Sequence, residues 1–325
     1  MVAAATLLFM LVGTASAQTR NASPAPRTAW GDPDLRGIWD FRSLTPFERP
    51  VEFGEKKELS EEEAAEAIEA ANETWRGIQD GNEAMPTGSY NEAWYDVTGV
   101  AQDRRTSLIV SPADGRIPSL TASEMRRQEE IARERQGLGA HEVSNGGFVE
   151  ELGPGHLAVR CIVGFSSGPP MTPSAYNNNV QVFQTRAHVA LLNEMIHTVR
   201  IIPLGERPAH DIRQQLGASH GYWDGDTLVV ETSNFLREIG FMASHNLKNL
   251  RLVERFTRVS PQTLMYEATV NDPTVWTSDW KYQLYMQQSD APIYEYACHE
   301  GNYGLPNILA GAREAERTME EGRGR

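Results

Sequence analysis

The chain of 325 residues is long enough for one large domain or two smaller ones, and its hydrophobic fraction of 40% is ordinary for a globular protein. Its 44 acidic residues outnumber its 30 basic residues and give a formal net charge of −14. This charge argues against binding to nucleic acid or to anionic membrane surfaces, so the expected partner is a small-molecule ligand or substrate.

The first residues, Met1 to Ala17, predict a signal peptide. An apolar run ends in Ala15-Ser16-Ala17, the small-x-small pattern that signal peptidase cleaves, although no Lys or Arg precedes the run. The run is too short to span a bilayer. We therefore expect a periplasmic or secreted mature protein, with a disordered leader over residues 18–29 that is rich in Pro, Ala and Ser.

Residues 30–155 are expected to form an extended arm and two helices that pack on the rest of the domain. Trp30 and Trp39 flank a turn-rich segment and are expected to pin it onto the domain surface. Two capping boxes predict where the helices begin. They are Ser60-Glu61-Glu62-Glu63, for a helix to about Arg76, and Thr121-Ala122-Ser123-Glu124, for a helix to about Gln136. Between them, residues 104–110 predict a short strand.

From about His156 the pattern favours strands. Apolar or alternating runs cover Leu157–Phe165, Val180–Thr185, Ala187–Glu194, Ile196–Pro203, Thr227–Thr232, Leu250–Val259, Thr263–Val270 and Trp280–Met286. The Asp-Gly pair at Asp224-Gly225 and the Ser260-Pro261-Gln262 segment predict tight hairpins. The predicted fold class is mainly β with flanking helices.

We expect residues 156–325 to form an antiparallel β-barrel of about eight strands, lipocalin-like, followed by a C-terminal helix over about residues 307–321. Closure into a barrel is favoured because it removes exposed sheet edges. A two-sheet sandwich is the alternative.

Six segments together resemble a family of secreted bacterial proteins. They are WGDPDLRGIWDF, RTSLIVSPADGRIP, EMIHTVRIIPL, GYWDGDTLVVETSNF, LVERFTRVSPQTLMYEATVNDP and IYEYACHEGNYGLPNILAGAR. The resemblance spans most of the mature chain and implies secretion and a single domain. It brings no reaction, cofactor or catalytic residue.

The two cysteines, Cys161 and Cys298, are expected to form one disulfide. An even number of cysteines in an exported chain favours pairing. Two unpaired thiols are the alternative.

The densest group of polar side chains lies between the last predicted strand and the last predicted helix. There His299 suits general acid–base catalysis, and Glu300 could orient it or raise its pKa. Asn302 could donate to a developing oxyanion, and Tyr303 could contact a substrate. In the alternative interpretation this segment is a helix start, and Glu300 and Asn302 cap the final helix.

His197 is the third predicted catalytic residue. It alternates along a strand with Val199 and Ile201, which form an apolar face, so we expect His197 to point inward. Arg200 could hold an anionic group of the substrate if a bend brings it round. A core histidine without a catalytic role is the alternative. The predicted site lies where the C-terminal segment meets the strand of His197.

Charged residues within strands either face water or line the interior of a barrel. Four belong to this group: Glu231, Glu254, Arg255 and Glu267. The solvent-facing interpretation is favoured. Arg213 and Trp223, in and after the loop that also carries His220, are further candidates for substrate binding because loops often carry function.

The chain contains no HExxH, GxSxG or GxGxxG motif, and we predict no cofactor. A metal site built from His197, His299 and a Glu is the alternative. The sequence then favours an extracytoplasmic, cofactor-independent acid–base enzyme, a lyase, isomerase or hydrolase acting on a small organic or sugar-derived compound in a barrel pocket. A non-catalytic barrel that binds a small ligand is the alternative.

Overall fold

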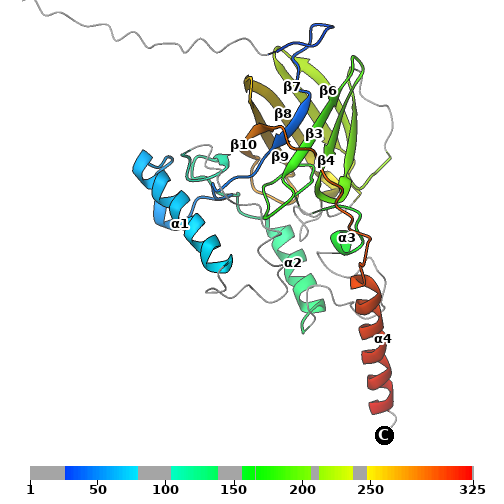
Figure 1. Ribbon diagram of the computed structural model, residues 1–325. Helices are drawn as coiled ribbons and strands as arrows, with labels where there is room; N and C mark the ends of the chain where they lie inside the picture. The colour runs from blue at the N-terminus through cyan, green and yellow to red at the C-terminus, as the bar shows by residue number, and fades with distance from the viewer. Residues whose placement is uncertain are drawn as a thin grey trace, which may run out of the picture.

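The computed structural model describes residues 26–79, 104–137, 156–164, 166–205, 212–236 and 247–323. The predicted signal peptide and most of the predicted leader lie outside these residues. The described strands form one ten-stranded sheet, and the helices lie beyond one end of it (Figure 1). No helix in these ranges has the length and hydrophobicity needed to cross a membrane.

Every ladder between neighbouring strands of the sheet is antiparallel. The strand order is β5-β4-β3-β1-β10-β9-β8-β7-β6, and β2 pairs with β10 beside this path. The strands are β1 (Gly37–Asp40), β2 (Ile109–Ser111), β3 (Asn179–Gln184), β4 (His188–Asn193), β5 (Val199–Pro203), β6 (Ala218–Asp224), β7 (Thr227–Ser233), β8 (Arg251–Ser260), β9 (Thr263–Asn271) and β10 (Trp280–Ser289).

The prediction of a mainly antiparallel β fold is confirmed, but the sheet has ten strands and is not closed by a ladder. Its two ends, β5 and β6, approach each other at one isolated parallel bridge between Leu204 and Gly221. Gly205 N donates a hydrogen bond to Gly221 O there, at 3.0 Å. Seven of the eight predicted runs are strands, and the sheet adds β6 together with β1 and β2, which come from the segment that we predicted to pack outside the barrel.

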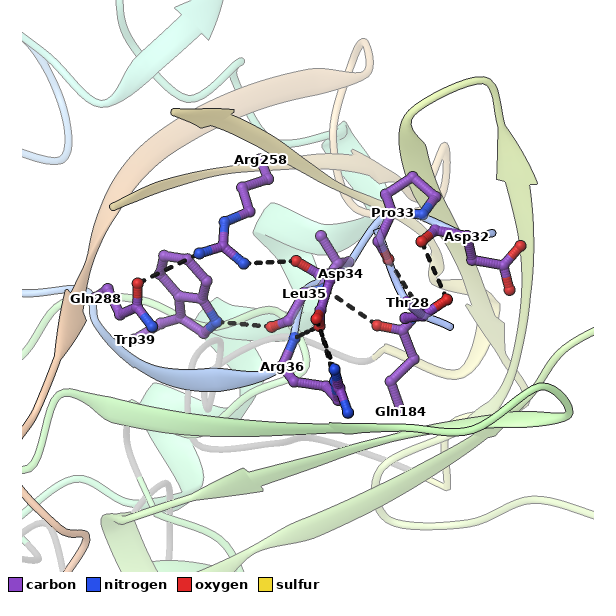
Figure 2. A network of polar contacts seen from close by, with 10 residues as sticks. All are labelled: Thr28, Asp32, Pro33, Asp34, Leu35, Arg36, Trp39, Gln184, Arg258 and Gln288. Carbon is purple, nitrogen blue, oxygen red and sulfur yellow. Dashed lines mark hydrogen bonds and ion pairs between the residues drawn. The ribbon is translucent and has the colours of Figure 1, made fainter. Parts of the chain in front are cut away.

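The N-terminal arm enters the sheet, as Figure 2 shows in close-up. β1 fills the space between β3 and β10, and the fully buried Trp39 donates from Nε1 to Leu35 O at 2.9 Å. Gln184 accepts from Leu35 N at 3.1 Å, and Arg258 donates to Asp34 O at 2.7 Å while its guanidinium lies over the Trp39 ring. Trp39 is therefore a core residue, whereas we expected it to pin the arm to the surface.

Alternation along the strands directs one face of each into a common core. On β9, for example, Leu264, Tyr266, Ala268 and Val270 are all fully buried. Aromatic rings from neighbouring strands pack in tilted pairs, such as Phe256 against Tyr266 with centroids 5.1 Å apart. The interior is therefore filled by large side chains, whose burial is a major source of stability.

The helices are α1 (Glu61–Gln79), α2 (Ala122–Glu134), α3 (His156–Val159) and α4 (Gly304–Arg323), with short 3-10 helices η1 (Val51–Phe53), η4 (Met195–His197) and η6 (Leu247–Asn249). Both predicted capping boxes begin a helix. Ser60 Oγ accepts from Glu63 N at 3.2 Å, and the Glu63 carboxylate accepts from Ser60 N at 2.7 Å. Thr121 Oγ1 accepts from Glu124 N at 3.2 Å.

The prediction of a strand over Leu157–Phe165 is wrong, because the run begins with the helical turn α3. Leu157 and Val163 are both buried. Cys161 adopts a left-handed conformation with φ 56°, which a continuous strand does not contain. The spacing of apolar residues in so short a run does not distinguish a buried strand from a buried helical turn.

Candidate functional site

The predicted disulfide between Cys161 and Cys298 is confirmed, with its Cα atoms 5.7 Å apart. It joins the chain after α3 to the segment before α4. Around it lies a small hydrophobic cluster in which the rings of Tyr176 and Tyr296 stack with centroids 6.4 Å apart. We call this the disulfide cluster. Its members are Cys161, Ala175, Tyr176, Met195, Ile196, Tyr296 and Cys298.

The turn η4 has an unusual backbone at the point where it joins this cluster. Ile196 has φ 54° and ψ 26°, and His197 has φ 41°. A β-branched residue rarely adopts this left-handed conformation, and such a residue costs about 1–3 kcal/mol. Of the five non-glycine residues with positive φ in the described ranges, four lie in the cluster or next to a member of it in sequence. They are Cys161, Asn177, Ile196 and His197.

Glu194 begins the same turn, and its buried carboxylate links three parts of the chain. Oε2 accepts from Asn179 Nδ2 on β3 at 2.8 Å, and Oε1 accepts from the backbone N–H of Tyr294 at 3.5 Å. The carboxylate therefore holds the C-terminal segment against the sheet. Glu194 was not among the predicted catalytic residues, although it lies only three residues before His197 in the sequence.

His197 is exposed, so the prediction that it points inward is wrong. Val199 and Ile201 do share one face of β5, but they are 50% and 67% exposed, and His197 lies in η4, before that strand begins. The interior face of β5 carries Arg200 and Ile202 instead. The apolar residues Val199 and Ile201 suggested that their face of β5 is buried. The buried face is the opposite one, because it carries Arg200 and its ion pair with Glu254.

Arg200 lies inside the sheet and does not reach a surface where it could hold a substrate. It donates from Nη1 and Nη2 to the two carboxylate oxygens of Glu254 at 2.9 and 2.5 Å. Nη2 also approaches Ser219 Oγ and Thr232 Oγ1, and Tyr266 Oη donates to Glu254 Oε1 at 2.9 Å. We call these five residues the interior network. The favoured solvent-facing interpretation is thus wrong for Glu254.

Electrostatics keep the charges of the interior network paired, and they keep its phenol Tyr266 and the nearby Tyr282 neutral. Burial alone would lower the pKa of Arg200, but the charge of Glu254 and its hydrogen bonds raise it. Burial, and then the Glu254 charge, raise the pKa of Tyr266 well above 10.0. Tyr282, whose pKa burial also raises, donates to Met171 O at 2.6 Å, and Met171 N donates to Tyr266 Oη at 3.1 Å. These hydrogen bonds link β5, β8, β9 and β10 to the segment of Met171 and rigidify the core, although Arg200 Nε has no partner among the described residues.

Of the four candidate residues in the C-terminal segment, three are exposed and the fourth, Asn302, has a structural role. His299, Glu300 and Tyr303 are exposed in the turn before α4. Asn302 Nδ2 donates to Val159 O at 2.9 Å, and its Oδ1 accepts from Gly304 N at 3.0 Å, where α4 begins. Asn302 therefore caps the start of the final helix, as the alternative interpretation expected. The segment does reach the turn of His197, but through Tyr294 and Tyr296.

Arg213 and Trp223 make contacts that support the fold. Arg213 Nη1 donates to Phe235 O and Lys248 O at 2.9 and 2.7 Å, which joins two loops. Trp223 packs partly buried against the main core. In the ranges that the structure describes, no three His, Cys, Asp or Glu side chains form a group that could hold a metal ion, so the alternative of His197, His299 and a Glu finds no support there.

The turn of η4 is thus the place where most features of a functional site coincide: a strained backbone, an exposed imidazole and a buried carboxylate. The resemblance to a family of secreted bacterial proteins stays a prediction, because no family model, no curated protein and no solved structure matches the chain.

Proposed function

We propose that this protein is an extracytoplasmic acid–base enzyme that acts on a small organic or sugar-derived compound at the turn of η4. His197 is its proton-transfer group, and Glu194 begins the turn that carries it. The observation that carries the proposal is the left-handed backbone of Ile196 and His197 within a disulfide-bonded frame. Strain of this kind persists only where the surroundings determine it, and it concentrates at functional sites.

The frame around His197 supports this role. Met195 and Ile196 before it and Thr198 after it are all buried, so the backbone is fixed on both sides of an exposed imidazole. The hydrogen bonds that Glu194 accepts come from neutral groups, and it forms no ion pair with a described residue. The carboxylate therefore carries a negative charge that no described cation pairs with, on the residue that begins the turn of His197.

Two exposed tyrosines support the substrate class. Tyr294 and Tyr303 are each 71% exposed on the segment that the disulfide holds against this turn. Phenol rings offer an apolar face and a hydrogen-bonding end, which suits a sugar-derived ring. Histidine chemistry near neutral pH then fits a lyase or isomerase that moves one proton, or a hydrolase that activates water.

Carriage of a ligand inside the sheet is the weaker alternative. The interior positions around Glu254 hold Tyr266 and Tyr282, which are fully buried and hydrogen-bonded within the protein. In the described part of the chain these two side chains occupy interior positions that a carried ligand would use.

The test is a substrate panel applied to the oxidised, purified protein. The panel contains p-nitrophenyl esters and glycosides, and uronates whose cleavage creates an ultraviolet-absorbing double bond. We expect His197→Gln to abolish turnover of whichever compound the wild type converts. His188→Gln, which changes another exposed histidine on β4, should leave turnover unchanged. Equal turnover by wild type and His197→Gln, or ligand binding without turnover, overturns the proposal.

A further inference from the structure

A pocket of about 170 Å³ lies between the N-terminal arm and β2, and it shares no residue with the disulfide cluster. Three basic side chains line it, together with one carboxylate, one hydroxyl and an apolar wall. These are Arg49, Lys57, Arg105, Glu58, Ser107 and Ile109. Pockets for drug-sized ligands measure about 300–1,000 Å³, so this one suits a small group.

Arg49 is the most informative of the lining residues, because it is only 4% exposed and its side chain donates only to neutral groups among the described residues. Its Nε donates to Thr106 Oγ1 at 2.9 Å and its Nη1 donates to Ala113 O at 3.3 Å, and both acceptors are neutral. It forms no ion pair with any residue that the structure describes. A buried cation is costly unless an anion lies beside it, so its position points to an anion in the pocket.

Arg105 is held from outside the pocket, by β10. Its Nη2 donates to Gln283 O at 3.0 Å, its Nη1 lies 3.4 Å from Gln283 Oε1, and its guanidinium is 5.3 Å from the centroid of the Tyr285 ring. These contacts fix the plane of the guanidinium before any ligand arrives. A fixed guanidinium binds an oxyanion with less loss of conformational entropy than a free one.

Lys57 contributes a positive charge to the pocket, whereas its neighbour Lys56 does not. Lys56 forms an ion pair with Glu63 on α1 and does not line the pocket, whereas Lys57 lines it and pairs with no carboxylate of a described residue. Glu58 also pairs with no described cation. Arg49 and Lys57 therefore bring two positive charges that no described carboxylate pairs with, on a chain whose net charge is −14.

We propose that this pocket binds a small oxyanion, such as a phosphate, a sulfate or a dicarboxylate. Arg49 neutralises the buried end of the anion, Arg105 and Lys57 donate to its outer oxygens, and Glu58 accepts from a protonated oxygen or from a hydroxyl of the ligand. The site is separate from the catalytic turn and does not depend on the proposed reaction.

The test is isothermal titration calorimetry of the full chain with sodium phosphate, sodium sulfate and disodium succinate, at constant ionic strength. We expect saturable binding of at least one of them and a higher melting temperature in its presence. The ranking of the three anions distinguishes a tetrahedral ligand from a dicarboxylate. Lys57→Gln should weaken binding about tenfold or more, since a charged hydrogen-bond donor is lost.

Lys56→Gln is the matched control, since it removes a neighbouring charge outside the pocket, and it should change binding by less than about twofold. Arg49→Met should remove binding if the variant folds, and Lys57→Gln keeps the proposal testable if it does not. The proposal is overturned if none of the three anions binds saturably, or if Lys56→Gln and Lys57→Gln weaken binding equally.

Discussion

Arg200 and Glu254 join two separated parts of the sheet across its interior. Arg200 lies on β5, which ends the sheet on one side, and Glu254 lies on β8, the third strand from the other end. Their side chains are 3% and 0% exposed. The ion pair therefore connects the two ends of the sheet where no backbone ladder does so in the described residues.

Removing one partner of this pair should destabilise the protein strongly. Glu254→Gln leaves the Arg200 charge buried without its carboxylate, and we expect it to lower the free energy of unfolding by about 3–5 kcal/mol. The double variant Arg200→Met/Glu254→Leu removes both charges and should lose clearly less. Urea denaturation followed by circular dichroism measures both. A double variant as unstable as the single one would contradict this explanation.

The buried phenols should make the protein sensitive to alkali. Burial and the Glu254 charge raise the pKa of Tyr266 above its value in the unfolded chain, so above about pH 10 the unfolded state loses protons that the folded state keeps. Stability is fully present below about pH 10 and falls as the pH rises further. The double variant Tyr266→Phe/Tyr282→Phe should show a shallower fall in the free energy of unfolding. An unchanged slope would exclude these phenols as the cause.

Loss of the disulfide should cost stability without changing the sheet. The bond joins residues that are 137 positions apart, and removing a native disulfide costs about 2–5 kcal/mol. We expect Cys161→Ser/Cys298→Ser to shift the urea midpoint to lower concentration. The wild type under reducing conditions should shift equally, and an unshifted midpoint in either case would show that the cluster holds without the bond.

Alanine variants of Asn302 and His299 should differ in stability, because only Asn302 has a structural role in this segment. Asn302→Ala removes the hydrogen bonds to Gly304 N and Val159 O, and we expect it to lower the free energy of unfolding by about 0.5–2 kcal/mol. His299→Ala changes an exposed side chain and should stay within about 0.5 kcal/mol of the wild type. Thermal denaturation compares the two. A larger loss for His299→Ala would assign the structural role to the imidazole.

His197→Gly should increase stability while removing activity. Glycine adopts the left-handed conformation without the cost that a side chain carries there, and the exposed imidazole buries no apolar surface that would be lost. We expect a gain of up to about 1 kcal/mol in the free energy of unfolding. Such opposite effects are typical of strained functional residues. A destabilised His197→Gly would show that the imidazole supports the turn.

Local signals in the sequence predicted the local features of the fold. The Ser60 and Thr121 capping boxes begin helices, the Asp224-Gly225 pair forms a hairpin turn, and an even cysteine count predicted the bond to Cys298. Each depends on residues that are neighbours in sequence or on a simple count. β1 escaped prediction because four residues with one glycine carry too little pattern to indicate a strand.

The candidate site was predicted less well, for a specific reason. The period of two placed His197, Val199 and Ile201 on one face, but only tertiary contacts decide which face is buried. Glu254 lies far along the chain and makes the opposite side of β5 the interior one. Arg49 also escaped notice, because its burial and its neutral partners depend on how the arm folds onto β2.

The position of β1 has a consequence for how the chain folds. Residues 37–40 leave the ribosome before either neighbour exists, since β3 begins at Asn179 and β10 at Trp280. Contacts so distant in sequence must overcome a large loop-closure entropy before they stabilise anything, and chains dominated by such contacts fold slowly. Until β10 is synthesised, β1 lacks one of its two partners, so completion of the sheet is a late event that depends on both ends of the polypeptide.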